Sequence, residues 1–411
     1  VFHGGKALGV SPSEFAGTGS DRECEWRRLC PLAAQAWVRG GLKRSRPLQV
    51  EKYCRHWDLS VEAYCSPEQL VLQMEGPRDS FNSSLKLAHA LVAAPGFEAD
   101  TVAALRSEWT EIMSARAKNL DRRVQEKLVE MLLQDETERL SDSYCKNDID
   151  LAEPNTLSAC IASLTGAVHP EVCLSGSLEP AEVEDLVKKY MGTLPTGPQN
   201  LSTAHLKERF ILNWTGRRTA FTLFVPSSTV QSRIGIAFPT VGRWGTFQDS
   251  ISEYEWEARL EGRGLNGVLF ISRCLDIAAR ILRIRLTRVL SRQVEDLVVS
   301  FHPLEVYSSG LFSIMMSPRS ERLKEVIRDT ESELSQLVRE GAEEAEFQQA
   351  KQTGVQEMEA AMCTNEYWNL LMEHLQSGLN PKSLDCIDEN CHSYSFISRQ
   401  DVNKVVQELW R

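Results

Sequence analysis

The residues Val172–Pro195, with the sequence VCLSGSLEPAEVEDLVKKYMGTLP, carry the clearest structural pattern in this chain. Three apolar residues at the start predict a short strand, and Gly176 permits a sharp turn after it. Pro180 suits a first helical turn, because the N–H that proline lacks has no helical partner there. Apolar residues then recur at helical spacing until Gly192. The stretch therefore predicts a buried strand covered by an amphipathic helix.

The size, charge and cysteines of the chain limit its class. Its 411 residues predict about two or three domains. A formal net charge of -11 argues against a general binder of nucleic acids or anionic membranes, because both need a basic surface. The sequence has no apolar run long enough to span a bilayer. Its eleven cysteines lack paired short spacings, which favours reduced thiols in a soluble, intracellular protein.

The order of expected strands and helices divides the chain into two α+β units. Residues 1–20 are rich in Gly and Ser, so we expect a disordered lead there, and residues 21–195 form the first unit. Gly, Pro and Asn mark residues 196–208 as a linker. Residues 209–411 form the second unit, with a similar order of elements.

The sequence indicates an internal repeat when it is aligned with itself so that Val102 coincides with Phe347. At this offset the pair of helices expected at 98–134 coincides with the pair expected at 343–375. The low identity leaves open two unrelated α+β segments with ordinary amphipathic helices. A duplicated domain is the favoured interpretation, and superposing the two helix pairs would test it.

Several stretches together resemble the insulinase (pitrilysin) family of zinc metallopeptidases, in the branch similar to the coenzyme-PQQ-synthesis proteases. Val172–Pro195 resembles the strand, turn and helix that end a domain in this family. Further stretches resemble patterns of the same domains, in the same order: Gly40–Leu42, Ala94–Phe97, Ser308–Ile314 and Gly341–Lys351. The resemblance covers about residues 27–411. It implies two homologous domains, each a mostly antiparallel sheet covered on one face by helices, which form one half of a clamshell around a peptide.

The zinc motif of this family is missing from the chain. Family members carry His-x-x-Glu-His in the first half, where two histidines bind zinc and the Glu acts as base on the metal-bound water. No two of the eight histidines here have that four-residue spacing. The chain thus resembles the second half, which implies no metal in this chain, zinc in a separate catalytic half, and no activity alone. The implied partners are that catalytic N-terminal half or a homologous subunit, and a peptide substrate.

The second half of family members usually supplies an Arg and a Tyr that hold the substrate near the zinc. The similar passage here is Leu286–Ser300, in which Thr287 replaces the Arg. Val294 or Asp296 occupies the Tyr position, depending on the alignment. Two nearby arginines are the candidate substrate-binding residues: Arg288 and Arg292.

Three other features have simpler interpretations. Five arginines within residues 280–292 would suit an acidic partner, but interleaved apolar residues favour an amphipathic helix with a solvated basic edge. Cys386, Cys391 and His392 lack the paired spacing of zinc sites, which favours a chance cluster. Residues 242–272 match no family pattern, and both an inserted helix and loop and a faulty gene model account for them.

Two classes of function remain. In the first, the chain is the substrate-enclosing half of a zinc endopeptidase whose catalytic half lies upstream. In the second, it is a catalytically inactive homologue that binds a peptide or protein partner. The missing Arg and Tyr favour the second class, and the start at Val1 rather than Met favours the first. We also expect both sheets to lack strands, and the isolated chain to be marginally stable and to self-associate.

Overall fold

The structure, a computed structural model, describes nine stretches of the chain. They are residues 2–8, 20–65, 70–132, 146–166, 171–194, 232–241, 267–304, 309–376 and 392–409. The linker expected at 196–208 and most of the segment 242–272 lie outside these stretches. None of the helices in the described stretches combines the length and the apolar character that crossing a bilayer requires.

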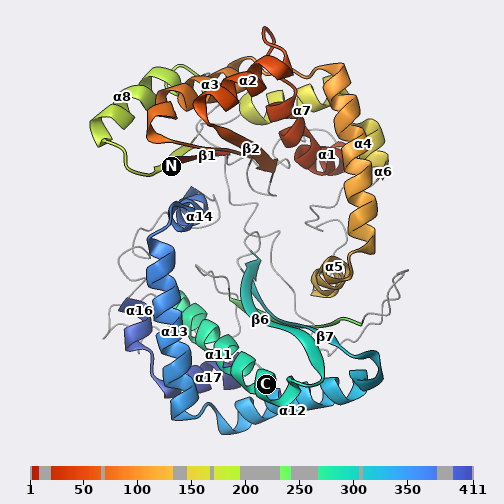
Figure 1. Cartoon of the computed structure of the whole chain (residues 1–411), viewed down its shortest axis with the longest axis vertical. Coiled ribbons are helices and arrows are strands. Elements are labelled where there is room, and N and C mark those ends of the chain that lie inside the picture. The colour runs from red at the N-terminus through yellow and green to blue at the C-terminus, as the bar shows by residue number, and fades with distance from the viewer. Residues whose placement is uncertain are drawn as a thin grey trace. The chain divides into compact units, whose positions relative to one another are not determined.

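The chain forms two compact units, and each half of the sequence contributes one helix to the unit of the other half (Figure 1). Unit 1 comprises Val1–Ala115, Leu140–Lys207 and Met362–Lys382, and unit 2 comprises Arg116–Arg139, Glu208–Ala361 and Ser383–Arg411. Helix α5 (Leu120–Leu132) therefore belongs to unit 2, and helix α14 (Asn365–Gln376) belongs to unit 1.

The sheet of unit 1 has four described strands in the order β2-β3-β1-β4, and all neighbours are antiparallel. The strands are β1 (Phe2–Leu8), β2 (Ser60–Cys65), β3 (Leu70–Gly76) and β4 (Glu171–Ser175). We expected a disordered lead at 1–20, whereas residues 2–8 form an inner strand. The Gly-rich lead has weak intrinsic strand propensity, and pairing with β3 on one side and β4 on the other overrides it.

The helices of the first half cover one face of this sheet. They are α1 (Ser20–Arg39), α2 (Pro47–Trp57), α3 (Phe81–Ala93), α4 (Ala99–Lys118), α6 (Lys146–Leu151), α7 (Pro154–Gly166) and α8 (Pro180–Tyr190). Trp37 of α1 is fully buried, and its indole Nε1 donates a hydrogen bond to the carbonyl of Leu91 in α3. Leu70, Leu72 and Met74 alternate along β3 and pack into the same core.

Helix α14 lies on the opposite face of this sheet and contacts β1 and β4 (Figure 1). On β4, Val172 and Leu174 pack against the core formed with the first-half helices. Ser175 points the other way, and its Oγ donates a hydrogen bond of 2.8 Å to Oδ1 of Asn369 in α14. Because successive side chains of a strand point to opposite faces, α14 and the first-half helices sandwich the sheet.

Unit 2 repeats this arrangement with three described strands in the order β5-β7-β6, again antiparallel. Its strands are β5 (Ile234–Val241), β6 (Val294–Leu304) and β7 (Ser309–Pro318). Its helices are α11 (Gly267–Leu290), α12 (Leu323–Glu340), α13 (Glu344–Met362), α16 (His392–Phe396) and α17 (Arg399–Leu409). A short 3-10 turn, Ser320–Arg322, precedes α12, as the turn Arg78–Ser80 precedes α3 in unit 1.

Helix α5 packs on the second face of the unit 2 sheet, as α14 does on the unit 1 sheet. Met316 of β7 contacts Thr330 of α12 on one face. On the other face, Gly235 of β5 lies directly under α5: a Cβ placed there would stand 2.7 Å from Cδ1 of Leu128. The side chain at this position must be absent for α5 to approach the strand this closely.

The two units share the order of their elements, which supports a duplicated domain. Three pairs of helices begin at the offset that the sequence repeat indicates: α4 with α13, α5 with α14, and α7 with α17. The strand orders β2-β3-β1 and β6-β7-β5 also correspond. The α+β prediction is confirmed. The exchange of α5 and α14, which covers part of the second face of each sheet, was not predicted.

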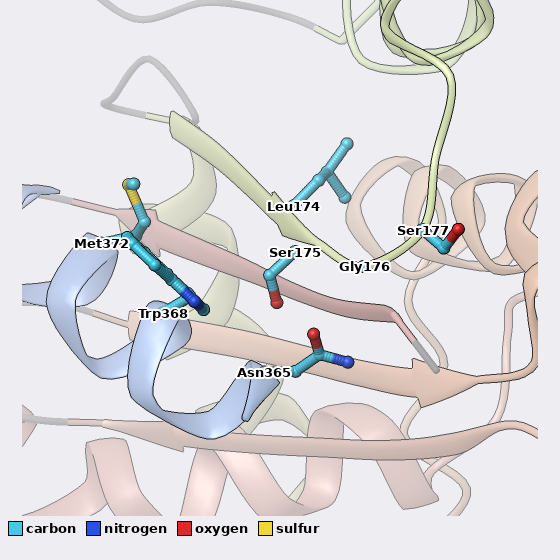
Figure 2. A pocket seen from close by; sticks show the side chains of 7 residues that line it. All are labelled: Leu174, Ser175, Gly176, Ser177, Asn365, Trp368 and Met372. Carbon is cyan, nitrogen blue, oxygen red and sulfur yellow. The ribbon is translucent and has the colours of Figure 1, made fainter. Parts of the chain in front are cut away.

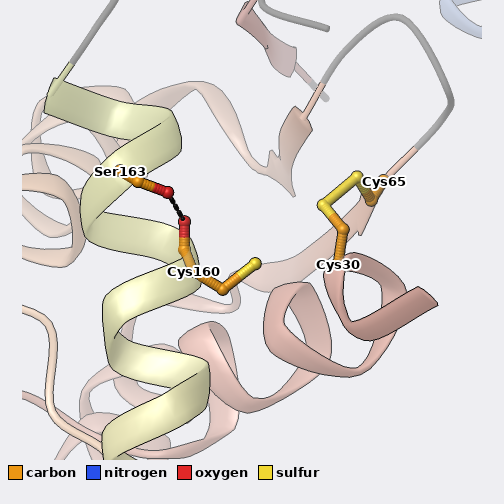
Figure 3. Close-up of a disulfide and its surroundings, with 4 residues drawn as sticks. All are labelled: Cys30, Cys65, Cys160 and Ser163. Atoms are coloured by element: carbon orange, nitrogen blue, oxygen red, sulfur yellow. Dashed lines mark hydrogen bonds between the residues drawn. A yellow bond between two sulfur atoms is a disulfide. The ribbon is translucent and has the colours of Figure 1, made fainter. Parts of the chain in front are cut away.

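A disulfide joins Cys30 of α1 to Cys65 at the end of β2 (Figure 3). The expectation of reduced thiols is wrong for Cys30 and Cys65. These two cysteines therefore give no support to an intracellular location. The two cysteines are distant in the sequence and meet only because α1 packs against β2. Cys160 and Cys173 are buried free thiols, and burial raises their pKa values to about 12 and about 11.

Candidate functional site

The two predicted substrate-binding arginines lie at the surface where α11 ends. Arg288 is in the last turn of α11, its side chain is 66% exposed, and its Nη2 lies 3.9 Å from Oε1 of Glu346. Arg292 is exposed in the turn that leads into β6. The part of the chain that the structure describes contains no group of three or more His, Cys, Asp or Glu side chains that could hold a metal. Substrate binding by Arg288 and Arg292 stays a prediction.

The two residues that align with the family's Tyr, Val294 and Asp296, have roles in the fold of unit 2. Val294 is the first residue of β6. Oδ2 of Asp296 lies 2.8 Å from Nη1 of Arg233, whose guanidinium also pairs with Asp121 of α5. The side chain of Arg233 is only 7% exposed. Asp296 therefore helps Arg233 to hold α5 and β6 together.

Three arginines along α11 form ion pairs: Arg280, Arg285 and Arg288. Arg285 is 5% exposed and binds the carboxylate of Glu346 with both Nε and Nη2. Arg280 pairs with Asp276 on its own helix and with Glu357 of α13. The expectation of a solvated basic edge is wrong at Arg285, because its guanidinium is buried between α11 and α13.

Two of the three residues considered as a chance metal cluster, Cys386 and Cys391, lie outside the described stretches. The third, His392, is the first residue of α16.

Unit 1 has a pocket of about 510 Å³ at the end of its edge strand (Figure 2). Its lining comes from the end of β4, the turn after it, and one side of α14: Leu174, Ser175, Gly176, Ser177, Asn365, Trp368 and Met372. Gly176 has a φ of +144°, a backbone conformation that L side chains rarely adopt. The turn therefore needs glycine at this point, and the backbone itself forms part of the wall.

Helix α14 presents different residues to the sheet and to the pocket. Tyr367 and Leu371 are buried, and Asn369 accepts the hydrogen bond from Ser175 of β4. Asn365, Trp368 and Met372 follow at i, i+3 and i+7, so they share a neighbouring side of the helix. The indole Nε1 of Trp368 donates a hydrogen bond of 2.9 Å to the carbonyl of Met362, just before the helix. This bond fixes the ring plane that forms the apolar wall.

The lining of this pocket suits binding rather than proton transfer. None of its seven residues carries a carboxylate, imidazole, thiol or ammonium group. Its polar atoms are the hydroxyls of Ser175 and Ser177 and the amide of Asn365. An apolar wall with a few fixed polar groups is typical of sites that bind a ligand by shape and hydrogen bonds.

The sequence pattern of Val172–Pro195 predicts a strand, a turn and a helix, but it does not predict this pocket. The three lining residues that come from α14 lie far along the chain, in the other half of the sequence. The available signal was the repeat, whose offset identifies α14 as the counterpart of α5 but does not say that the two helices are exchanged.

Comparison with known proteins gives consistent matches. Residues 153–353 match the family model described as "Peptidase M16 inactive domain". The chain is 21% identical over 391 residues to the chloroplastic stromal processing peptidase of Pisum sativum, an alignment that covers 88% of this chain and 30% of the peptidase. It spans 21–31% of the length of the stromal processing peptidases it matches.

Solved structures share the fold. The periplasmic protease PqqL from Escherichia coli superposes with a TM-score of 0.72 at 11% identity, covering 99% of this chain and 41% of PqqL. A peptidase M16 inactive domain from Pseudomonas fluorescens superposes with a TM-score of 0.69 at 14% identity, covering 99% of this chain and 90% of that one. These matches confirm the resemblance found in the sequence. Residues 153–353 thus match the inactive domain of the M16 peptidases, the insulinase-like family, and the chain as a whole shares the fold of these proteins.

Proposed function

We propose that this chain is a non-catalytic half of an M16 peptidase, which binds polypeptide substrates beside a zinc-bearing catalytic half. The observation that carries the proposal is the match of residues 153–353 to the inactive domain of the family. The chain also spans less than a third of the processing peptidases it matches, which leaves ample length in such proteins for a catalytic half.

The zinc would be held by the catalytic half, through the His-x-x-Glu-His motif that this chain lacks. Two histidines and a third ligand on that half would bind the metal, and the Glu would act as base. The contribution of this chain would be to bind and orient the polypeptide. Arg288, exposed beside Glu346, and Arg292 are the proposed contacts to substrate in unit 2.

A reconstitution experiment tests the proposal. The purified chain, and the chain co-expressed with a zinc-bearing M16 half from the same organism, are assayed for bound zinc and for cleavage of a quenched fluorescent peptide. We expect the chain alone to bind no stoichiometric zinc and to cleave nothing, and the pair to cleave faster than the catalytic half alone. One tightly bound zinc per isolated chain, or no effect of the chain on cleavage, would overturn the proposal.

A second function, an inactive homologue that binds a peptide or protein partner, is favoured by one observation. Asp296, at a position where the resemblance places the substrate-contacting Tyr, is paired with Arg233 inside unit 2. A carboxylate engaged in this way is a poor replacement for a Tyr that contacts substrate. If the chain binds peptides tightly but never accelerates cleavage, this second function is the correct one.

A further inference from the structure

The pocket at the end of β4 has an aromatic wall that is held in place from two sides. Trp368 of α14 donates its only N–H to the carbonyl of Met362. The ring of the buried Tyr367 lies nearly perpendicular to the indole, with the two ring centroids 5.4 Å apart. The indole therefore offers the pocket a π face and no hydrogen-bonding atom. Because this wall is already ordered, a flat ring can bind to it at little cost in conformational entropy.

The second apolar residue that α14 contributes is Met372, one turn after Trp368 (Figure 2). At this spacing the two side chains lie on the same side of the helix. The thioether sulfur of methionine is polarizable and makes favourable contacts with aromatic rings. Trp368 and Met372 together thus favour a planar aromatic group over an aliphatic one.

The wall formed by β4 supplies a hydrogen-bond acceptor. The hydroxyl of Ser175 has a single proton, which it donates to Oδ1 of Asn369 over 2.8 Å. Its oxygen can therefore only accept a bond from a molecule in the pocket, and such a molecule needs an N–H or O–H donor. The carbonyl of Gly176, the next residue, accepts the N–H of Leu178 within the turn. This bond helps to fix the backbone on that side of the pocket.

The lining provides no counter-charge for an ion. None of its seven residues is acidic or basic, so a charged molecule would lose its hydration without compensation. The volume of about 510 Å³ lies within the range that is usual for small-molecule sites. The pocket therefore suits a neutral molecule.

We propose that this pocket binds a small, neutral, planar aromatic molecule that has an N–H or O–H donor at one edge. The ring stacks on Trp368 beside Met372, and the donor bonds to Oγ of Ser175. Strand β4 comes from the first half of the sequence and α14 from the second, so a molecule that contacts both joins these two parts of unit 1. The inference goes beyond the proposed function, because it assigns to unit 1 a ligand other than a polypeptide.

The test uses indole as the probe and measures its affinity for the unaltered chain by ligand-observed NMR titration. Indole is neutral and planar and has one N–H donor, and we expect a Kd of about 1 mM or lower. Benzofuran has the same shape with an oxygen in place of the N–H, and should bind about threefold to tenfold more weakly. Cyclohexanol should bind more weakly than phenol by a similar factor, because it has the same donor but no flat ring.

Two charged analogues test the requirement for neutrality on the same unaltered chain. Tryptamine is a cation and indoleacetate an anion at neutral pH, and both contain the indole ring. Each should bind at least about tenfold more weakly than indole, because the lining offers neither a carboxylate nor a cationic group. These comparisons do not depend on how any variant folds.

Three variants place the molecule in this pocket. Trp368→Ala should weaken indole binding at least about tenfold, whereas Trp368→Phe should keep most of it. Ser175→Ala should make indole and benzofuran bind equally, because the acceptor that distinguishes them is gone. Leu370→Ala is the matched control and should bind indole as the unaltered chain does, because Leu370 is 40% exposed on the same helix and does not line the pocket.

Hydrogen exchange gives an independent measurement. If indole binds only while α14 is seated on the sheet, the α14 amides should exchange about fourfold more slowly at an indole concentration three times the Kd. No binding of indole, charged analogues that bind as tightly as indole, or full binding by Trp368→Ala would overturn the inference. Equal binding of indole and benzofuran by the unaltered chain would also overturn it. The proposed function is judged by the separate cleavage assay, which needs no molecule in this pocket.

Discussion

The buried ion pair between Arg285 and Glu346 gives a sharp prediction about the stability of unit 2. The two residues are 5% and 7% exposed. Nη2 and Nε of Arg285 lie 2.7 and 3.0 Å from Oε2 of Glu346, and Nη2 also donates a hydrogen bond of 2.9 Å to the carbonyl of Gly341. The pair thus joins α11 to the start of α13.

The perturbation is Glu346→Leu, which leaves the guanidinium of Arg285 buried without its counter-charge. At a charge separation of about 4 Å and an effective dielectric constant of about 20, the lost attraction is about 4 kcal/mol. Breaking a buried pair by removing one partner costs about 3–5 kcal/mol, which agrees with this value. We therefore expect the free energy of unfolding of unit 2 to fall by about 3–5 kcal/mol.

The assay is urea unfolding followed by circular dichroism, with hydrogen exchange of the α11 amides to assign the transition to unit 2. The double variant Arg285→Met with Glu346→Leu should be much more stable than Glu346→Leu, because an apolar pair of similar volume leaves no buried charge. The control is Glu108→Leu, which removes an exposed pair with Arg39, whose side chains are 43% and 52% exposed. That change should cost less than about 1 kcal/mol. A loss below about 1 kcal/mol for Glu346→Leu, or strictly additive effects in the double variant, would refute the reasoning.

Three further predictions concern the disulfide, the thiols and the exchanged helices. Reducing Cys30–Cys65 should destabilise unit 1 by roughly 3–4 kcal/mol, because the bond closes a long loop between α1 and β2; equal melting temperatures with and without reductant would contradict this. Burial raises the pKa of Cys160 to about 12, so at pH 8 it stays a protonated thiol. Iodoacetamide should therefore label exposed Cys363 first in the native protein, as mass spectrometry of the digested protein would show. Gly235→Leu should displace α5 from β5 and expose the amides of α5 to hydrogen exchange, because its side chain would overlap Leu128; unchanged exchange would show that α5 does not pack there.

Much of the fold was accessible from the sequence because its signals are local. Val172–Pro195 contains a strand, a turn and a helix, and the structure places β4 and α8 there. The offset of the internal repeat anticipated the corresponding starts of α4 and α13. The sequence patterns do not predict α2, and they predict a disordered lead where β1 lies. In β1, the low strand propensity of Gly4 and Gly5 hides a strand that pairing with two neighbours stabilises.

The sequence by itself determined most of the elements, their repeat and the absence of the zinc motif, because periodicity, turn residues and motif spacing are properties of neighbouring residues. Only the tertiary structure decided which sheet each helix covers. The amphipathic pattern of α14 states that one side must be buried, but not that the burying sheet lies in the other half of the chain. The pocket of Trp368 with Ser175, the disulfide Cys30–Cys65 and the buried charge of Arg285 all depend on contacts between distant residues. Such contacts form when elements pack together, and no local pattern encodes them.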